Sequence, residues 1–151
     1  SPAELARGQK KLRLAAMLLY SFPGSPTLYY GDEAGMQGFE DPLNRGTYPW
    51  GGEDGSLLAF FRRLGQLRAE RVSLQCGIIR YLHAQGGGLV VERLHGTERT
   101  VTALNAGDTP LELTLPWDGR LCIDAVTGQQ FLSQNGTVHL TLPPLDGVIL
   151  V

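Results

Sequence analysis

The sequence predicts an α+β protein in two parts: a helix–strand–helix segment, followed by an all-β antiparallel domain. Two observations lead to this prediction. The first part has apolar residues at helical spacing on both sides of one short apolar run, and the second part alternates apolar and polar residues between turn signals. With 151 residues, 42% hydrophobic and 19% charged, the chain has a globular composition. We predict two domains, residues 1–72 and 73–151.

The first predicted helix covers residues 3–20, which are rich in the helix formers Ala, Leu, Lys and Arg. Pro23 and Gly24 end it. One face of this helix is expected to be buried, through Leu5, Leu12, Ala16 and Leu19.

Residues 27–30, Thr-Leu-Tyr-Tyr, then predict a short strand that is covered on both faces, as in a parallel sheet. A long loop over residues 31–55 follows it. A second helix is expected to begin at Asp54 or Ser56, either of which can be its N-cap. Its apolar stripe is made of Leu57, Phe60, Phe61, Leu64 and Leu67.

The β domain is predicted from runs that alternate at period two and are separated by Gly, Asn and Asp turn residues. These runs are residues 78–82, 89–94, 100–104, 111–115, 138–142 and 147–151. Their spacing indicates an antiparallel sandwich or a barrel-like β domain.

One strand between two helices is not a domain, because the helical stripes need a sheet to cover. Each large apolar side chain left in water forfeits ~1.5–3 kcal/mol. The order of elements is that of a βα barrel unit. We therefore expect residues 1–72 to be the terminal segment of a (β/α)8 barrel whose earlier strands are missing from this chain. Its exposed apolar surface also predicts self-association.

The loop over residues 31–55 would lie at the C-terminal end of a barrel strand, where barrel enzymes build their sites. Carboxylates and guanidinium groups bind hydroxyls, and aromatic rings pack on sugar rings, so this composition suits a polyhydroxylated ligand. The alternative is a solvated surface on which the charges pair with each other. The polar and aromatic side chains concerned are Asp32, Glu33, Glu40, Asp41, Arg45, Tyr48, Trp50 and Glu53.

Within this loop, a turn at Pro42 would bring Asp41 and Arg45 to the same side, as a clamp for hydroxyl groups. The alternative is a local ion pair that stabilises the loop by well under ~1 kcal/mol. Glu33 is expected to be a structural carboxylate at the barrel rim, because the side chains of Asp32 and Glu33, as neighbours at a strand end, diverge.

Charge and cysteine content narrow the class of function. A net charge of −2 and a pI near 5.9 give no electrostatic support for binding nucleic acid or an anionic membrane. No apolar run is long enough to span a bilayer.

Cys76 and Cys122 are expected to be small buried hydrophobes, with no partners at metal-ligand spacing. We expect no metal site, no cofactor and a cytoplasmic location.

Residues 24–36, GSPTLYYGDEAGM, closely resemble the eighth-strand segment of the α-amylase family, glycoside hydrolase family thirteen. The motifs DPLNR at residues 41–45 and YPW at residues 48–50 resemble the branch of neopullulanases, cyclomaltodextrinases and maltogenic amylases. The resemblance is specific over residues 12–70, and the β domain is similar in placement to the C-terminal sandwich of that family.

The resemblance implies a parent enzyme that is a retaining hydrolase of α-linked glucans such as maltooligosaccharides, cyclodextrins or pullulan. The family's nucleophilic Asp, acid/base Glu and second Asp follow the fourth, fifth and seventh barrel strands, so none falls in this chain. We assign no catalytic residue and expect the chain alone to be inactive. The resemblance implies that Asp41 and Arg45 bind glucosyl hydroxyls and that Glu33 is structural; it leaves calcium binding in the parent open.

Two other classes of function stay open. A non-catalytic carbohydrate-binding module would present an aromatic platform on the β part, from Tyr81, Trp117 and Phe131. An interaction domain would use the exposed apolar surface of the barrel segment to bind another chain or a second copy.

Overall fold

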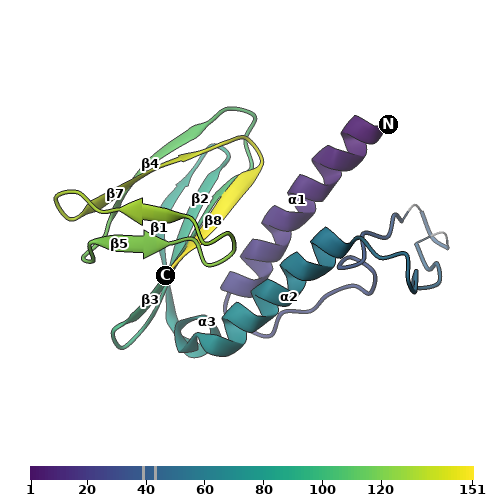
Figure 1. Ribbon diagram of the computed structural model, residues 1–151, viewed down its shortest axis with the longest axis horizontal. Helices are drawn as coiled ribbons and strands as arrows, with labels where there is room; N and C mark the ends of the chain where they lie inside the picture. The colour runs from purple at the N-terminus through teal and green to yellow at the C-terminus, as the bar shows by residue number, and fades with distance from the viewer. Residues whose placement is uncertain (39, 43) are drawn as a thin grey trace.

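The computed structural model describes residues 1–38, 40–42 and 44–151. It has a helical layer beside layers of strands (Figure 1). The elements described, in chain order, are α1 (Pro2–Ser21), α2 (Gly55–Glu70), α3 (Val72–Cys76), β1 (Ile78–Gln85), β2 (Gly88–His95), β3 (Glu98–Asn105), β4 (Leu111–Pro116), β5 (Leu121–Ile123), β6 (Gln130–Leu132), β7 (Thr137–Leu142) and β8 (Asp146–Leu150). The predicted mixture of helices and antiparallel strands is confirmed.

The strands form one four-stranded sheet in the order β1-β2-β3-β8 and two pairs, β4-β7 and β5-β6. All of these pairings are antiparallel. One face of the four-stranded sheet packs against the two pairs, which makes a sandwich. Its buried core includes Val90 and Val101 from the large sheet and Leu113, Cys122 and Val138 from the pairs.

The other face of the four-stranded sheet is covered by the helices. Leu14 and Met17 of α1 share a buried core with Leu64 of α2 and with Leu104 and Ile149 of the sheet. The apolar faces of the helices are therefore buried against this sheet. The predicted boundary between residues 72 and 73 falls at the start of α3, and the division into two domains stays a prediction.

The second helix follows its prediction closely. Asp54 is its N-cap, and the Asp54 side chain accepts hydrogen bonds from the backbone nitrogens of Ser56 and Leu57 at 2.9 and 3.0 Å. The five stripe residues are all buried: Leu57, Phe60, Phe61, Leu64 and Leu67.

Three predictions were wrong. Residues 27–30 form no strand among the described elements; a strand needs a neighbour to pair with, and every strand of the described sheets lies after residue 77. Of the α1 residues expected to be buried, Ala16 is buried and Leu12 is partly buried, but the other buried residues of α1 are Leu14, Met17 and Ser21. Leu5 is exposed instead, because the sheet covers another side of this helix. Cys76 is exposed at the end of α3, whereas Cys122 is buried as expected.

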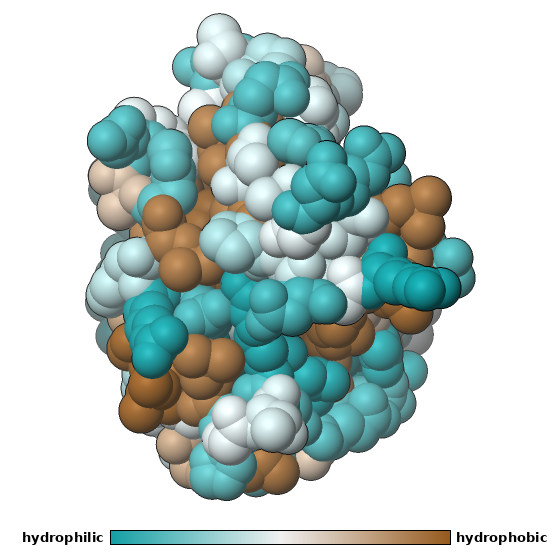
Figure 2. Space-filling model, turned by 90° about the vertical axis from the view of Figure 1, so that its left-hand side faces the viewer, coloured by the Kyte–Doolittle hydropathy of each residue, from teal (hydrophilic) through white to brown (hydrophobic). Residues whose placement is uncertain are grey.

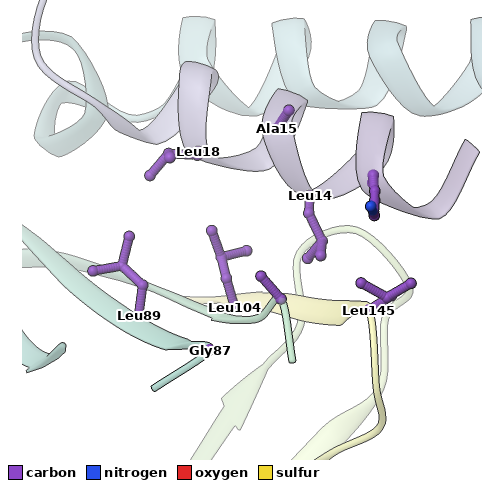
Figure 3. A pocket seen from close by; sticks show the side chains of 9 residues that line it. Leu14, Ala15, Leu18, Gly87, Leu89, Leu104 and Leu145 are labelled. Atoms are coloured by element: carbon purple, nitrogen blue, oxygen red, sulfur yellow. The ribbon is translucent and has the colours of Figure 1, made fainter. Parts of the chain in front are cut away.

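A cavity of about 450 Å3 lies where α1 crosses the sheet. Leu14 and Leu18 point from α1 toward Leu89, Leu104 and Leu145 (Figure 3). Its lining is apolar apart from Lys11, which fits a packing gap between layers better than a site with chemistry.

Candidate functional site

The loop between α1 and α2 lies at the end of the molecule away from the β layers (Figure 1). Residues 31–36 of this loop form a compact turn, in which the backbone nitrogens of Ala34 and Met36 both donate to the carbonyl oxygen of Gly31 at 3.0 Å. Gly31 has a φ of +93°, and a Cβ there would collide with the side chain of Met36. The turn therefore requires glycine at this position.

Glu33 closes this turn, because its Oε2 accepts a hydrogen bond from the backbone nitrogen of Gly31 at 3.0 Å. Its side chain is half-buried. This contact is compatible with the predicted structural role, while the location at a barrel rim stays a prediction.

The far end of the loop is anchored at the start of α2. The backbone nitrogen of Asp54 donates to the carbonyl oxygen of Ala34 at 2.9 Å. Gln9 of α1 donates to Asp54 Oδ2 at 3.0 Å. Both ends of the loop are thus fixed to the helical layer, and residues 36–38, 40–42 and 44–53 extend from this base.

Asp41 and Arg45 form the ion pair that their spacing predicts. Arg45 Nε lies 3.0 Å from Asp41 Oδ1, and Arg45 Nη2 donates to Asp41 Oδ2 at 3.2 Å. The peptide bond between Asp41 and Pro42 is cis. The two side chains are 60% and 68% exposed, so the pair is open to solvent and to a ligand. Its role in binding stays a prediction.

A cavity of about 420 Å3 lies beside this turn, a volume within the range of small-molecule sites. It is lined by Tyr29, Tyr30, Asp32, Met36, Gln37, Gly38 and Asn44. We call these seven residues, together with Asp41 and Arg45, the loop site. Arg45 directly follows Asn44 in the sequence, but neither Asp41 nor Arg45 lines the cavity.

Two tyrosines supply the aromatic surface of the loop site. The rings of Tyr29 and Tyr30 lie 5.1 Å apart, and both residues are exposed. Tyr30 is held in place by its hydroxyl, which donates to the carbonyl oxygen of Gly46 at 2.9 Å. Exposed tyrosine rings can pack against the apolar face of a sugar.

The polar groups of the loop site have spare hydrogen-bonding capacity. Among the described residues, Asn44 Oδ1 is buried and meets no donor. Burial, and then the nearby Glu33 carboxylate, raise the pKa of Asp32 above its ordinary value. A ligand that donates hydroxyl hydrogens would satisfy the Asn44 oxygen and stabilise the charged form of Asp32.

The remaining aromatic residues of the loop form a second pair. The rings of Tyr48 and Trp50 lie 4.6 Å apart, and Trp50 is 85% exposed. Burial, followed by the Glu33 and Glu53 carboxylates, raises the pKa of Tyr48. Glu40 and Glu53 do not line the cavity.

Sequence reasoning selected Asp41 and Arg45 but did not select the cavity residues Tyr29, Tyr30 and Asn44 as site residues. Both tyrosines were assigned to a buried strand, although two adjacent tyrosines before Gly31 are also typical of a binding surface. Asn44 is part of the DPLNR motif, so this motif could have identified it as a site residue.

In the part of the chain that the structure describes, no three His, Cys, Asp or Glu side chains are grouped to hold a metal ion. The same part contains no helix that is both long and apolar enough to cross a membrane.

Comparison with known sequences and solved structures finds several relatives of the chain. The chain is 34% identical over 157 residues to an amylopullulanase of Thermoanaerobacter thermohydrosulfuricus, matching 94% of the chain and 11% of that protein. It is 31% identical over 153 residues to neopullulanase 2 of Thermoactinomyces vulgaris, matching 94% of the chain and 26% of that protein. The crystal structure of an Anoxybacillus α-amylase superposes with a TM-score of 0.86 at 30% identity, covering 93% of the chain and 32% of that structure.

The chain belongs to the α-amylase family. Its relatives within this family include enzymes named as amylopullulanase and neopullulanase. No family model matches the chain. The chain spans about a tenth to a quarter of the length of these two relatives.

Proposed function

We propose that the chain is the C-terminal part of an α-glucan-acting retaining glycoside hydrolase and that its loop site forms one side of the substrate cleft. In this proposal, residues 1–72 close a (β/α)8 barrel and residues 73–151 form the C-terminal sandwich. The names of the relatives and their much greater length support it. The absence of a strand partner for residues 27–30 within the described chain also supports it.

The observation that carries the proposal is the exposed Asp41–Arg45 pair beside a cavity that has two tyrosine rings and unused polar groups. A glucosyl hydroxyl can accept from the guanidinium and donate to the carboxylate at the same time. Because the pair is open to solvent, the ligand does not have to break a buried contact. The apolar face of the sugar ring can then pack on Tyr29 or Tyr30.

The reacting carboxyl groups are proposed to lie in the rest of the barrel, so this chain alone binds glucan without cleaving it. The test is turnover of maltotriose, cyclodextrin or pullulan by the purified chain, followed by chromatography of the products. Hydrolysis that persists through purification to homogeneity would overturn this part of the proposal.

Binding by the loop site is tested by titrating the chain with maltotriose while its backbone amide signals and its tryptophan indole N–H signals are followed by NMR. We expect shifts at Tyr30, Asp32 and Arg45, and a dissociation constant that rises about fivefold or more in Arg45→Ala, which corresponds to the loss of one ordinary hydrogen bond of about 1 kcal/mol. Arg62→Ala is the matched control, since it removes an exposed arginine of α2 outside the cavity. Equal effects of the two variants would contradict the assignment.

The rival carbohydrate-binding module requires an aromatic platform on the β part. Trp117 is buried in the sandwich core, and Phe131 packs against that core. Tyr81 is exposed. On the face of the molecule that Figure 2 shows, the brown apolar areas are separated by teal polar ones. One exposed ring does not make a platform, so this observation favours the loop site as the main contact with glucan.

Self-association through the barrel segment is a separate proposal. Tyr29, Tyr30 and Trp50 are large exposed apolar residues of that segment, and a second copy could cover them. Sedimentation at increasing protein concentration tests it, with a strictly monomeric chain as the contrary result.

A further inference from the structure

A second cleft opens at one end of the sandwich, far from the loop in sequence. It has a volume of about 360 Å3. The residues that line it come from β1, β2 and β3 and from the end of β4 and the segment after it: Arg80, Leu82, Glu92, Leu94, Arg99, Pro116 and Asp118. We call it the sandwich cleft. We propose that it is a second binding site for a neutral polyhydroxylated ligand, namely a maltooligosaccharide segment of an α-glucan.

The floor of the sandwich cleft is an ion pair between the buried Glu92 and the half-buried Arg99. The side chain of Glu92 is 7% exposed, and its Oε1 accepts a hydrogen bond from Arg99 Nε at 2.5 Å. Arg99 is fixed by two further contacts: its Nη1 donates to the carbonyl oxygen of Pro116 at 2.8 Å, and its guanidinium lies 4.7 Å from the ring centroid of Trp117. These polar groups are therefore positioned before a ligand arrives.

The rim of the cleft is more open. Arg80 faces Glu92 across the β1–β2 pairing, but its Nη1 lies 3.8 Å from Glu92 Oε2, which is too long for a hydrogen bond. Arg80 and Asp118 are exposed. A hydroxyl group placed between Arg80 and Glu92 could accept from the first and donate to the second, and so complete the contact.

The charges of the lining decide which ligand class fits. Two arginines are balanced by Glu92 and Asp118, so the cleft has no net charge. A phosphate or a carboxylate would meet the arginines but would be repelled by the buried Glu92. An apolar ligand would cover the exposed Arg80 and Asp118 without offering either of them a hydrogen-bond partner. A sugar both donates and accepts hydrogen bonds, and its apolar face can lie on Leu82, Leu94 and Pro116.

The choice of an α-glucan among neutral saccharides rests on the proposed function of the loop site. The two proposals make separate predictions, because the chain contains two tryptophans, Trp50 in the loop and Trp117 under Arg99. The indole Nε1–H of Trp117 donates to the carbonyl oxygen of Leu121 at 3.1 Å and gives its own NMR signal. The Trp117 indole therefore reports on the sandwich cleft, and the backbone amides of Tyr30, Asp32 and Arg45 report on the loop site.

The experiment is an NMR titration of the full 151-residue chain with maltotriose. We expect shifts in the Trp117 indole and in the backbone amides of Arg80, Glu92 and Arg99, with a dissociation constant that rises about fivefold or more in Arg80→Ala. Arg120→Ala is the matched control, because it removes an exposed arginine of the same domain that does not line the cleft.

The results that would overturn the sandwich cleft can be told apart from those that would overturn the loop site. Shifts confined to the loop would overturn the sandwich cleft and leave the loop site standing. Shifts confined to the cleft would overturn the loop site and leave this inference standing. If inorganic phosphate shifts the cleft residues and maltotriose does not, the cleft binds anions and the proposal is wrong. An Arg80→Ala variant that binds as tightly as Arg120→Ala would also overturn it.

Discussion

Arg93 of β2 donates a hydrogen bond from its Nη1 to the carbonyl oxygen of Ser21, the last residue of α1, at 2.7 Å. Arg93 is 1% exposed, and its Nη2 also donates to the carbonyl oxygen of Gly77 at 2.8 Å. Carbonyls at the end of a helix have no partner within the helix. Arg93 supplies one from the sheet and is thus one of several side chains that connect the helical layer to the sandwich, together with Arg63 of α2 and Arg71 between α2 and α3.

We expect Arg93→Met to destabilise the chain by at least about 2 kcal/mol, because it removes the donor from the buried carbonyl oxygen of Ser21 and from the partly buried one of Gly77. Urea unfolding followed by circular dichroism measures the change. Arg62→Met, on the exposed side of α2, is the control and should change stability little. If the two variants unfold at the same urea concentration, the link between the layers does not contribute in this way.

Unlike Arg93, the exposed Asp41–Arg45 pair should contribute little to the folding stability of the chain. Because it is solvated, we expect a coupling free energy of less than about 1 kcal/mol in a double-mutant cycle of Asp41→Ala and Arg45→Ala. The same variants should weaken maltotriose binding. A large loss of folding stability would mean that the pair serves mainly to hold the loop.

These contrasts show what the sequence could and could not predict. The second helix was predictable because its cap at Asp54 and its stripe from Leu57 to Leu67 are local signals. The buried face of α1 was not, because apolar residues occur on several of its sides and only the position of the sheet decides between them. The strand at residues 27–30 was predicted from propensity, but a strand depends on a partner that the described chain does not supply.

The loop site and the sandwich cleft also differ in how far the sequence alone could predict them. Asp41 and Arg45 are four residues apart, so one turn brings them together, and the sequence predicted it. The sandwich cleft joins Arg80, Glu92 and Arg99 through strand register. Charged residues in an alternating run are normally assigned to the solvent face, so the burial of Glu92 had no signal in the sequence.

The two cysteines should differ in reactivity. Cys76 is exposed, and its Sγ lies 3.6 Å from His95 Nδ1. Cys122 is buried, and burial raises the pKa of its thiol. We expect one thiol to react rapidly with Ellman's reagent in the folded chain and the second to react only after unfolding. Cys76→Ser should abolish the rapid reaction; equal rates for the two thiols would contradict the assignment.

The helix cap at Asp54 predicts a dependence of stability on pH. The hydrogen bond from Leu57 is the largest cause that lowers the pKa of Asp54 in the folded chain. A lowered folded-state pKa stabilises the fold above the unfolded value of about 3.9, and this stabilisation is lost as pH falls through the folded value. Asn also caps helices but does not titrate. The stability advantage of the natural chain over Asp54→Asn should therefore be largest above about pH 4 and shrink in acid.

Thermal unfolding at a series of pH values measures this difference. The control is Asp118→Asn, a change at an exposed residue in the segment after β4. A pH-independent difference for Asp54→Asn, or the same trend in Asp118→Asn, would count against the cap as its origin.

Replacing glycine by alanine should have opposite effects on folding stability at Gly8 and at Gly77. Gly8 lies in α1, where an added Cβ meets no atom within 4 Å, so Gly8→Ala should stabilise the chain by about 0.5–1 kcal/mol. At Gly77, between α3 and β1, an added Cβ would collide with the carbonyl oxygen of Ser73 and lie 2.7 Å from that of Leu94. Because backbone atoms must move, Gly77→Ala should destabilise by about 1–3 kcal/mol. Urea midpoints that shift in the same direction would contradict the tight approach of α3 to β2.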